Sequence, residues 1–409
     1  KIMKNKKLYS VIGLGVAAMV LGLTAIAAKS SAPVEPMSRK IVVFKSGVDE
    51  AAKEALIDKF GGEKIKDLRL INGQAARLTA KAEKDLVRQP GILRIDDDVI
   101  VEALAKGGIS AKPAPVQPAE VLPWGIDRID AEKIWAITAG DSVKVAVVDT
   151  GIDISHPDLK DNIKGGMSAV AYTASYNDDN GHGTHVAGII GAIDNTIGVI
   201  GVGPKIDLYA VKVLDRRGSG YLSDIIEGLD WAISNGIQVV NMSLGTTANI
   251  LSFQEAVQRV NAAGIVQVAA AGNSGGSVNY PAAYPEVIAV SATNNLDAIA
   301  SWSSRGPEVD LSAPGVSVYS TYKGQVYKTL SGTSMAAPHV AGAAALVLTM
   351  AFSSSTIGDW DLNNDGFWDP SEVQNKLEMT AEQVVPDTIP GKDNLYGAGL
   401  VDAEKAVVQ

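Results

Sequence analysis

The chain has 409 residues, of which 46% are hydrophobic and 20% are charged, and its formal net charge is −10. This length and composition are typical of a globular protein with one large core and a smaller companion domain. The lack of a basic cluster beyond the first residues excludes nucleic acid as an expected partner. The lack of cysteine excludes disulfide bonds, so packing or bound metal must stabilise the fold.

Residues 1–28 have the form of a secretory signal peptide. Lys4, Lys6 and Lys7 give a positive start, and an almost wholly apolar run follows. Residues 25–27 offer a small-residue cleavage site. We therefore expect a secreted, extracellular protein without stable membrane association after signal removal. The alternative is a retained membrane anchor, because about 20 apolar residues can span a bilayer. No later segment is expected to be apolar for long enough to span one.

A small α+β domain is predicted between residues 38 and 104. Its six segments follow the order β-α-β-β-α-β, which implies a ferredoxin-like sheet with both helices on one face. The segments are strands at Ile41–Phe44, Ile65–Ile71, Ala75–Leu78 and from Ile92 onward, and helices at Asp49–Phe60 and Lys81–Gln89.

Residues 105–120 are expected to form a linker, or an amino-terminal extension of the domain that follows. The stretch AKGGISAKPAPVQPA at 105–119 is rich in glycine and proline and lacks hydrophobic periodicity. Segments of this kind are preferred sites of proteolytic cleavage.

Residues 121–409 are predicted to form a doubly wound α/β domain with a mostly parallel sheet. Continuous apolar strands that alternate with helices imply a sheet covered by helices on both faces. The expected strands are 143–151, 208–214, 239–245, 265–273 and 287–293, and the expected helices are 223–234, 253–263 and 334–350. In such folds the functional site lies beyond the carboxyl ends of the strands. This domain is acidic, since residues 105–409 hold 18 basic and 33 acidic side chains.

Three motifs carry the candidate chemistry. Asp149 ends a buried strand in VVDTGID, His182 lies in NGHGTHVAG, and Ser334 opens a long apolar helix in SGTSMAAPHVAG. Acyl transfer by a serine needs a base that accepts the hydroxyl proton and an acid that orients the base. The amino end of a helix favours the negative charge that develops near the serine.

All three motifs, in this order and at comparable spacing, resemble those of the subtilisin-like serine proteases. The likeness runs from Leu122 to Val407. Residues 38–104 resemble the inhibitory propeptide of that family, which places a propeptide at 29–104. The segment VLPWGIDRI and the linker are most similar to hyperthermophilic archaeal members. The resemblance implies a serine endopeptidase made as a self-processing precursor.

The family also implies an oxyanion site and a substrate channel. The side chain of Asn273 and the backbone N–H of Ser334 would bind the oxyanion. Two segments would pair with an extended protein or peptide substrate, which implies broad specificity. These segments are Gly218, Ser219 and Gly220, and Ser243, Leu244 and Gly245.

The family pattern further places Ser274 and Asn279 in the first specificity pocket. Thr246 stands where a glycine is common, so the pocket rim is expected to be narrower. The propeptide is expected to act as intramolecular chaperone and inhibitor of a monomeric enzyme. Self-cleavage is expected near Glu102–Lys106. The bond after Leu104 is favoured, because Ala103 and Leu104 suit an apolar cleft, and the alternative is a register shifted by two residues.

A twelve-residue stretch from Asp361 to Glu372 fits an EF-hand calcium loop at every position. Oxygen ligands fall at positions 1, 3, 5, 9 and 12, glycine falls at position 6, and position 7 would contribute its carbonyl. The ligands would be Asp361, Asn363, Asp365, Phe367, Asp369 and Glu372. We expect a single structural ion, and the alternative is a surface turn rich in Asp and Asn.

A second calcium site is implied by the resemblance alone. Its ligands would be Glu120, Asp158, the side chain of Asn195, and the carbonyls of Ile193, Ile197 and Val199. The alternative is that these acidic residues are ordinary solvated charges.

Two alternatives to the serine protease interpretation remain, a zinc site formed by the histidines and a protein without catalytic activity. His182 and His185 are three residues apart, but no HExxH glutamate follows them, which argues against a zinc protease. His156, His185 and His339 are expected to be packed structural residues. The alternative function is a catalytically silent, calcium-binding adhesion protein on the same fold, and such a protein would have lost at least one of the catalytic residues.

Overall fold

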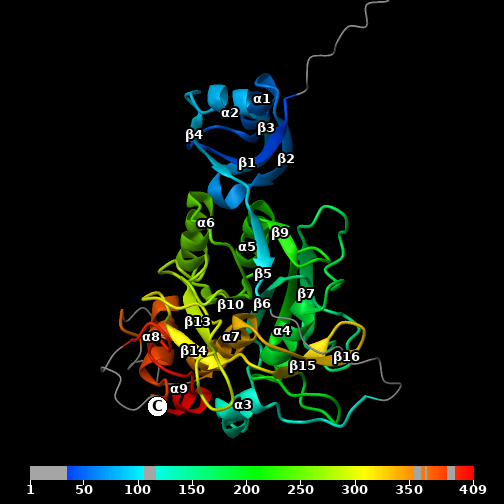
Figure 1. Ribbon diagram of the computed structural model, residues 1–409, viewed down its shortest axis with the longest axis vertical. Coiled ribbons are helices and arrows are strands. Elements are labelled where there is room, and N and C mark those ends of the chain that lie inside the picture. Colours follow the sequence, from blue (N-terminus) through cyan, green and yellow to red (C-terminus); the bar gives the residue numbers. More distant parts are fainter. Residues whose placement is uncertain (1–34, 106–116, 354–360, 364–365, 385–391) are drawn as a thin grey trace, which may run out of the picture. The chain divides into compact units, whose positions relative to one another are not determined.

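The computed structural model describes residues 35–105, 117–353, 361–363, 366–384 and 392–409 (Figure 1). Two units are distinguished, Lys1–Pro36 and Met37–Gln409. The second contains every described helix and strand. The expected signal peptide and most of the expected linker lie outside the described residues, so both stay predictions.

The amino-terminal domain is an antiparallel sheet in the order β2-β3-β1-β4 with two helices. Its elements are β1 (Met37–Phe44), α1 (Glu50–Lys59), β2 (Glu63–Leu68), η1 (Arg69–Ile71), β3 (Gly73–Thr79), α2 (Ala80–Leu86) and β4 (Ile92–Asp97). The predicted element order is confirmed. The predicted strand Ile65–Ile71 is wrong at its end, because η1 is a single 3-10 turn that ends at the left-handed Asn72 (φ 52°).

The large domain is built on a seven-stranded sheet in the order β14-β13-β12-β10-β6-β8-β7. All neighbouring pairs in it are parallel. The strands are β6 (Lys144–Asp149), β7 (Ile163–Ser168), β8 (Asp207–Lys212), β10 (Val239–Met242), β12 (Val266–Ala270), β13 (Ile288–Thr293) and β14 (Leu311–Pro314). The α/β fold predicted from the alternating segments is confirmed.

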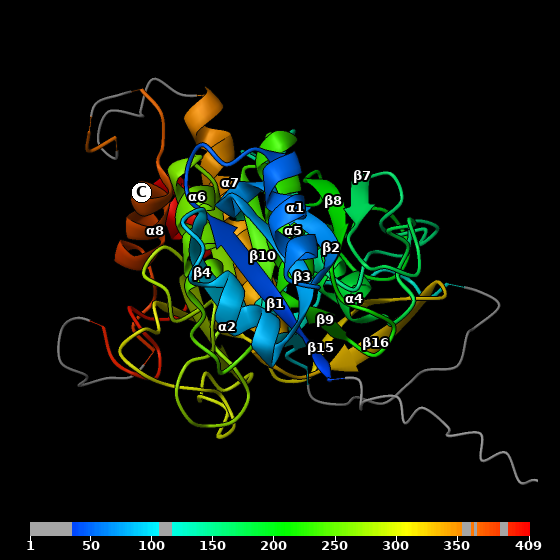
Figure 2. The ribbon, with the colours of Figure 1, turned by 90° about the horizontal axis from the view of Figure 1, so that it is seen from above.

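Helices cover both faces of this sheet because its strands are apolar on both sides. Val145 and Val147 of β6 join the core cluster of α4 and α7, whereas Ala146 and Val148 join the cluster of α5 and α6. Helices α5 and α6 lie side by side (Figure 2). These four helices are α4 (His182–Gly191), α7 (Thr333–Ser353), α5 (Leu222–Ser234) and α6 (Leu251–Ala262).

The α5–α6 face also receives the amino-terminal domain. Alternation along β1 gives that domain two apolar faces. Val42 and Phe44 pack with Ile57 beneath α1 and α2. Ile41 and Val43 point the other way and belong to the same core cluster as α5 and α6.

Several elements lie beyond the sequence predictions. Two of them, β7 and β14, belong to the large sheet. The others are β5 (Ile100–Ala103), α3 (Trp124–Arg128), η2 (Ala131–Ile134), β9 (Ser219–Tyr221), β15 (Val318–Tyr322), β16 (Val326–Leu330), α8 (Pro370–Met379) and α9 (Ala403–Val408). The predicted strand 239–245 is divided into β10 and β11 (Leu244–Gly245). The helix α4 is also absent from those predictions, because its glycine and histidine positions lower its helix propensity and its burial on all sides hides any periodicity.

One helix among the described residues is long and apolar enough to cross a membrane. It is Thr333–Met350 within α7, and 89% of it is buried inside the protein. The prediction that no later segment has such a composition is therefore wrong. The reason is that α7 forms the centre of a core cluster and needs apolar residues on every side.

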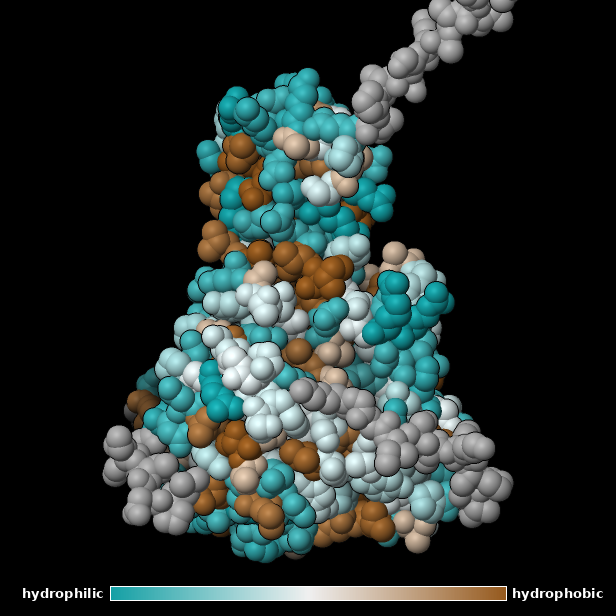
Figure 3. Space-filling view, in the orientation of Figure 1, coloured by the Kyte–Doolittle hydropathy of each residue, from teal (hydrophilic) through white to brown (hydrophobic). Residues whose placement is uncertain are grey.

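On the face shown in Figure 3, hydrophobic side chains occur in small separate groups among hydrophilic ones.

Candidate active site

Asp149 and His182 form a buried pair. Asp149 is the last residue of β6, and His182 is the first residue of α4. Nδ1 of His182 lies 2.8 Å from each carboxylate oxygen of Asp149. Burial disfavours the imidazolium, but the charge and hydrogen bond of Asp149, together with the charge of Asp178, outweigh burial and raise the pKa of His182. The pair therefore favours proton uptake by the imidazole.

Ser334 lies in the first turn of α7, and its hydroxyl makes a contact that the sequence did not predict. Its Oγ donates to the carbonyl oxygen of Ser243 at 2.9 Å. Nε2 of His182 is buried and has no hydrogen-bond partner among the described residues. The structure thus joins Asp149 to His182, but the hydrogen bond between Ser334 and His182 is not formed.

Asn273 points its amide toward the carbonyl of Leu104. Its Nδ2 donates to that oxygen at 2.6 Å, and the backbone N–H of Ser334 approaches the same oxygen at 3.4 Å. Its Oδ1 accepts from the backbone N–H of Thr333 at 2.9 Å and from the Thr333 hydroxyl at 3.0 Å. Thr333 therefore fixes the amide with nitrogen toward Leu104. The sequence analysis missed Thr333, although its place directly before Ser334 was a usable signal.

The strand β5 occupies the channel between the two expected substrate-binding segments. It pairs antiparallel with β9 on one side and with β11 on the other. The backbone N–H of Ala103 donates to Gly218 at 2.9 Å, and that of Leu104 donates to Ser243 at 3.1 Å. Ser219 and Gly220 face Glu102 and Val101, and Leu244 and Gly245 face Ala103 and Glu102.

The Leu104 side chain lies beside Gly245. A Cβ atom on Gly245 would meet Cδ1 of Leu104 at 3.0 Å and Cβ of Asn279 at 3.2 Å. The structure thus brings Asn279 close to this side chain. Ser274 instead lies 3.3 Å from the hydroxyl of Ser304.

The sequence comparisons agree with this geometry. A family model described as the subtilase family matches residues 140–399, which is more than half of the 409 residues. The chain belongs to the subtilase family.

Three bacterial relatives illustrate the likeness. Subtilisin E of Bacillus subtilis (strain 168) is 40% identical over 415 aligned residues, covering 99% of this chain and all of the relative. Subtilisin J of Geobacillus stearothermophilus is 42% identical over 376 residues, covering 90% and 89% of the two chains. Subtilisin Savinase of Lederbergia lenta is 47% identical over 291 residues, covering 70% and 99%.

This subtilase is therefore a serine endopeptidase, and the alternative of a catalytically silent adhesion protein is not favoured. The relatives come from Bacillus and related bacteria. They do not support the expected closer likeness to hyperthermophilic archaeal members.

The amino-terminal domain of the subtilase caps two helices of the large domain. Asp98 accepts from the backbone N–H of Ser223 at 2.8 Å and from its hydroxyl at 2.9 Å, at the start of α5. Asp96 accepts from the backbone N–H of Ser252 at 3.0 Å and from its hydroxyl at 2.5 Å, at the start of α6. Lys66 adds ion pairs to α5, each at 2.5 Å, with Asp224 and Glu227. Carboxylates at helix amino ends are stabilising.

The structure brings together the loop expected to bind calcium around Asn195. Glu120 accepts from the backbone N–H of Asn195 at 2.7 Å, and Asp158 accepts from the Asn195 side chain at 2.7 Å and from the Val199 N–H at 2.9 Å. Burial, with the charge of Glu120, raises the pKa of Asp158 to about 6 against the effect of its hydrogen bonds. Among the described residues, no hydrogen-bond donor reaches the carbonyl oxygens of Ile193, Ile197 and Val199. This oxygen-rich donor set fits calcium.

The EF-hand-like stretch is described except for Asn364 and Asp365. Oδ2 of Asp361 accepts from the N–H of Gly366 at 2.9 Å, and Oε1 of Glu372 accepts from the N–H of Leu362 at 2.7 Å. Asp369 is the N-cap of α8, and its N–H donates to Oε2 of Glu372 at 2.8 Å. Carboxylates from both ends of the loop thus accept hydrogen bonds from backbone N–H groups within it. Asn363 donates from its amide to Asp369 at 2.8 Å.

No group of three or more Asp, Glu, His or Cys residues that could hold a metal occurs in the described part of the chain. The three other histidines are buried, and burial lowers the pKa of each, to about 3 for His185 and about 4 for His339. His156, His185 and His339 each contact a backbone carbonyl through one ring nitrogen.

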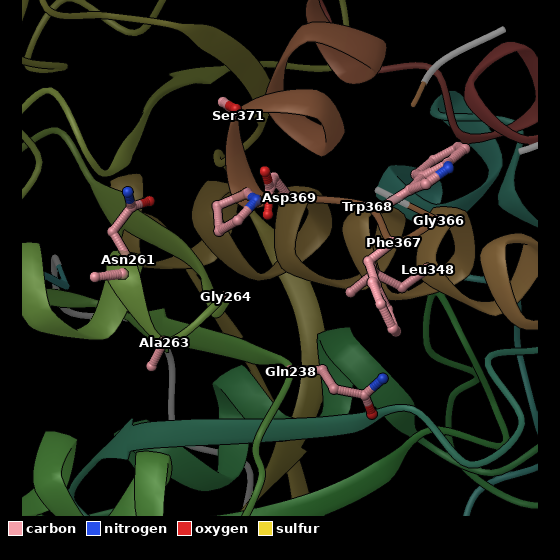
Figure 4. Close-up of a pocket in the computed structure, with 12 residues that line it drawn as sticks. Gln238, Asn261, Ala263, Gly264, Leu348, Gly366, Phe367, Trp368, Asp369 and Ser371 are labelled. Carbon is pink, nitrogen blue, oxygen red and sulfur yellow. The ribbon is translucent and has the colours of Figure 1, made fainter. Parts of the chain in front are cut away.

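A pocket of about 840 Å³ lies away from this site (Figure 4). Gln238 and Gly264, which line it, precede β10 and β12, so it lies at the amino ends of the strands. Figure 4 shows Phe367 and Leu348 on one side of it and Asn261 and Ala263 across from them. The candidate catalytic residues lie at the opposite, carboxyl ends, where β5 fills the channel.

Proposed function

We propose that this subtilase cleaves its own chain after Leu104 and then hydrolyses extended protein and peptide substrates at the same site, with Asp149, His182 and Ser334 as catalytic triad. The observation that carries this proposal is the Leu104 carbonyl oxygen, which faces both Nδ2 of Asn273 and the N–H of Ser334. The bond from Leu104 to Ala105 is then the first substrate.

The reaction begins when the Ser334 hydroxyl leaves the Ser243 carbonyl and turns toward Nε2 of His182. Oγ attacks the Leu104 carbonyl carbon while His182 accepts the hydroxyl proton, and Asp149 stabilises the imidazolium. Asn273 and the Ser334 N–H hold the oxyanion. His182 then protonates the Ala105 nitrogen as the peptide bond breaks, which leaves Leu104 esterified to Ser334. A water molecule, deprotonated by His182, hydrolyses the ester.

Residues 29–104 act as propeptide, inhibitor and intramolecular chaperone in this scheme. After cleavage, β5 still pairs with β9 and β11 and blocks the channel. The caps that Asp96 and Asp98 place on α6 and α5 support helices that flank the slow-folding parallel sheet. Residues 105–120 become the amino-terminal extension of the mature domain.

The channel accepts many sequences, because strand pairing through backbone groups does not depend on side chains. Selectivity comes from pockets such as the one beside Gly245 and Asn279, where Leu104 lies. Specificity is therefore broad with a preference for an apolar residue before the cleaved bond.

Calcium is the proposed cofactor at two sites. One ion would be held by Glu120, Asp158, Asn195 and the three carbonyl oxygens of the 193–199 loop that no described hydrogen-bond donor reaches. The other ion would be held by the residues of the 361–372 loop. Each ion would join chain segments whose carboxylates repel one another. It would therefore stabilise the fold and take no part in the reaction.

The enzyme is proposed to be a secreted monomer that has no stable membrane association after signal removal and does not bind nucleic acid. The signal-like residues 1–28 and the acidic large domain support this.

Labelling with a fluorophosphonate tests the catalytic assignment. Mature, calcium-loaded enzyme is expected to gain one label on Ser334 and to lose all peptidase activity, whereas heat-unfolded enzyme gains none. A label on another serine, or full activity after labelling of Ser334, would contradict the assignment.

A further inference from the structure

Asp178 lies in the loop before α4, buried with 6% of its surface exposed. Its carboxylate accepts five hydrogen bonds. Oδ1 accepts from the Thr150 hydroxyl at 2.9 Å and from the backbone N–H groups of Asn180 and Gly181 at 2.8 Å each. Oδ2 accepts from the Thr184 backbone N–H at 3.0 Å and from the Thr184 hydroxyl at 2.6 Å.

These partners favour an ionised carboxylate, although burial outweighs their effect and raises the pKa of Asp178. The three backbone N–H groups can only donate. The Thr150 hydroxyl accepts from the Gly183 N–H at 2.9 Å, and the Thr184 hydroxyl accepts from the Asp153 N–H at 2.9 Å, so each hydroxyl proton is directed to Asp178. An asparagine here would turn an NH₂ group toward some of these donors. A buried charge is costly unless such hydrogen bonds stabilise it.

The five bonds join the two elements that carry the catalytic pair. Thr150 follows Asp149, and its N–H donates to Oδ1 of Asp149 at 2.7 Å. Gly183 follows His182, and a Cβ atom there would lie 3.2 Å from Oδ1 of Asp149 and 2.2 Å from the Gly151 carbonyl oxygen. The end of β6 and the start of α4 are therefore in direct contact, and Asp178 is bonded to both.

We propose that Asp178 is a positioning residue for the reaction, because its carboxylate ties the end of β6 to the first turn of α4 and so holds the His182 imidazole beside Asp149. The inference rests on the proposed role of His182 as base. Asp178 would then be a second fixed carboxylate near the His182 imidazole, besides Asp149.

The negative charge of Asp178 also acts on the imidazole. Its charge adds to that of Asp149 in raising the pKa of His182, against the effect of burial. The other charged or titratable groups near the imidazole are paired or neutral. Lys212 of β8 is paired with Asp179 at 2.7 Å, and His185 on α4 is neutral because burial lowers its pKa to about 3.

The test compares Asp178→Asn with Asp179→Asn in the full chain. Both substitutions remove one negative charge from the same loop, but Asp179 contacts Lys212 and Tyr172 instead of α4. The pH dependence of kcat/KM is measured with a peptide substrate, per active site counted by fluorophosphonate. For Asp178→Asn we expect the acid limb to move down by about 0.5 pH unit or more, with kcat about tenfold lower and KM within about twofold. Asp179→Asn should leave the midpoint in place.

Equal midpoints and equal kcat for the two variants would overturn the proposal. A wild-type enzyme that fluorophosphonate does not inactivate would instead remove the proposed function, so the two failures are distinguishable. Should Asp178→Asn fail to mature, Thr150→Val is the second variant. It removes the hydroxyl link and keeps the charge, so we expect kcat about tenfold lower with an unmoved acid limb. Wild-type kcat in Thr150→Val would overturn the positioning role.

Discussion

The carbonyl oxygen of Leu104 lies 2.6 Å from Nδ2 of Asn273, and the N–H of Ser334 lies 3.4 Å from the same oxygen. Both donors thus already face the oxygen that gains negative charge during the proposed self-cleavage. Fixed donors of this kind lower a barrier because they need no reorganisation when the charge develops. The orientation of the amide depends on Thr333, which holds its Oδ1.

Replacing Asn273 by alanine should lower kcat with little change in KM. We expect a loss of about 10²–10³-fold, which is the magnitude measured when such a donor is removed from subtilisin itself. The measurement is steady-state kinetics on a peptide substrate. Ser274→Ala is the matched control, because Ser274 adjoins Asn273 but contacts Ser304. Equal kcat values in the two variants would contradict the role of Asn273.

Peptidase activity should fall as pH falls, because His182 must be neutral to accept the serine proton. Its pKa is raised by Asp149 and Asp178 above the ordinary value of 6.5, despite burial. The neutral fraction is therefore lost at a higher pH than for a free histidine, and the acid limb of kcat/KM should have its midpoint above 6.5. A midpoint below that value, or a flat profile from about pH 5 to 9, would be inconsistent with the proposed base.

Removing the cap that Asp98 provides should destabilise the precursor. Asp98→Ala in a Ser334→Ala precursor removes the carboxylate that accepts from Ser223 at the amino end of α5. It also removes the ion pair with Arg39, which is 2.8 Å long. We expect the free energy of unfolding to fall by about 1–3 kcal/mol, measured by denaturant titration. Glu63→Ala is the control, because the pair of Glu63 and Arg77 is exposed and 3.7 Å long, and such pairs contribute about 0–1 kcal/mol.

Calcium should stabilise the precursor before any cleavage. Residues 119 and 121 already bridge to 197 and 199 while Leu104 occupies the channel, so Glu120 does not need a free amino terminus to reach the site. In a Ser334→Ala precursor we expect calcium at about 100 times its Kd to add about 2.7 kcal/mol per site. Glu120→Gln should reduce this gain, and Asp194→Asn should not. An identical melting temperature with calcium and with chelator would contradict both sites.

The sequence predicted those features that short patterns encode. Five of the seven strands of the parallel sheet and the motifs around Asp149, His182 and Ser334 follow from apolar runs and short patterns. The strands β7 and β14 were not predicted, because β7 is only partly buried and lacks a continuous apolar run and β14 has four residues. The contacts of Ser334 and Asp178 could not be predicted, because they depend on a side-chain rotamer and on a loop whose partners are up to 28 residues away. The 3-10 turn Arg69–Ile71 was missed because its apolar residues continue the strand pattern of β2.

The mass and amino-terminal sequence of the purified protein test the central claim most directly, when wild type is compared with Ser334→Ala under identical expression. Wild type should yield a mature chain that begins at Ala105, and Ser334→Ala should keep the bond from Leu104 to Ala105 intact. Cleavage of both proteins at that bond would show that another protease cuts it and would contradict the account.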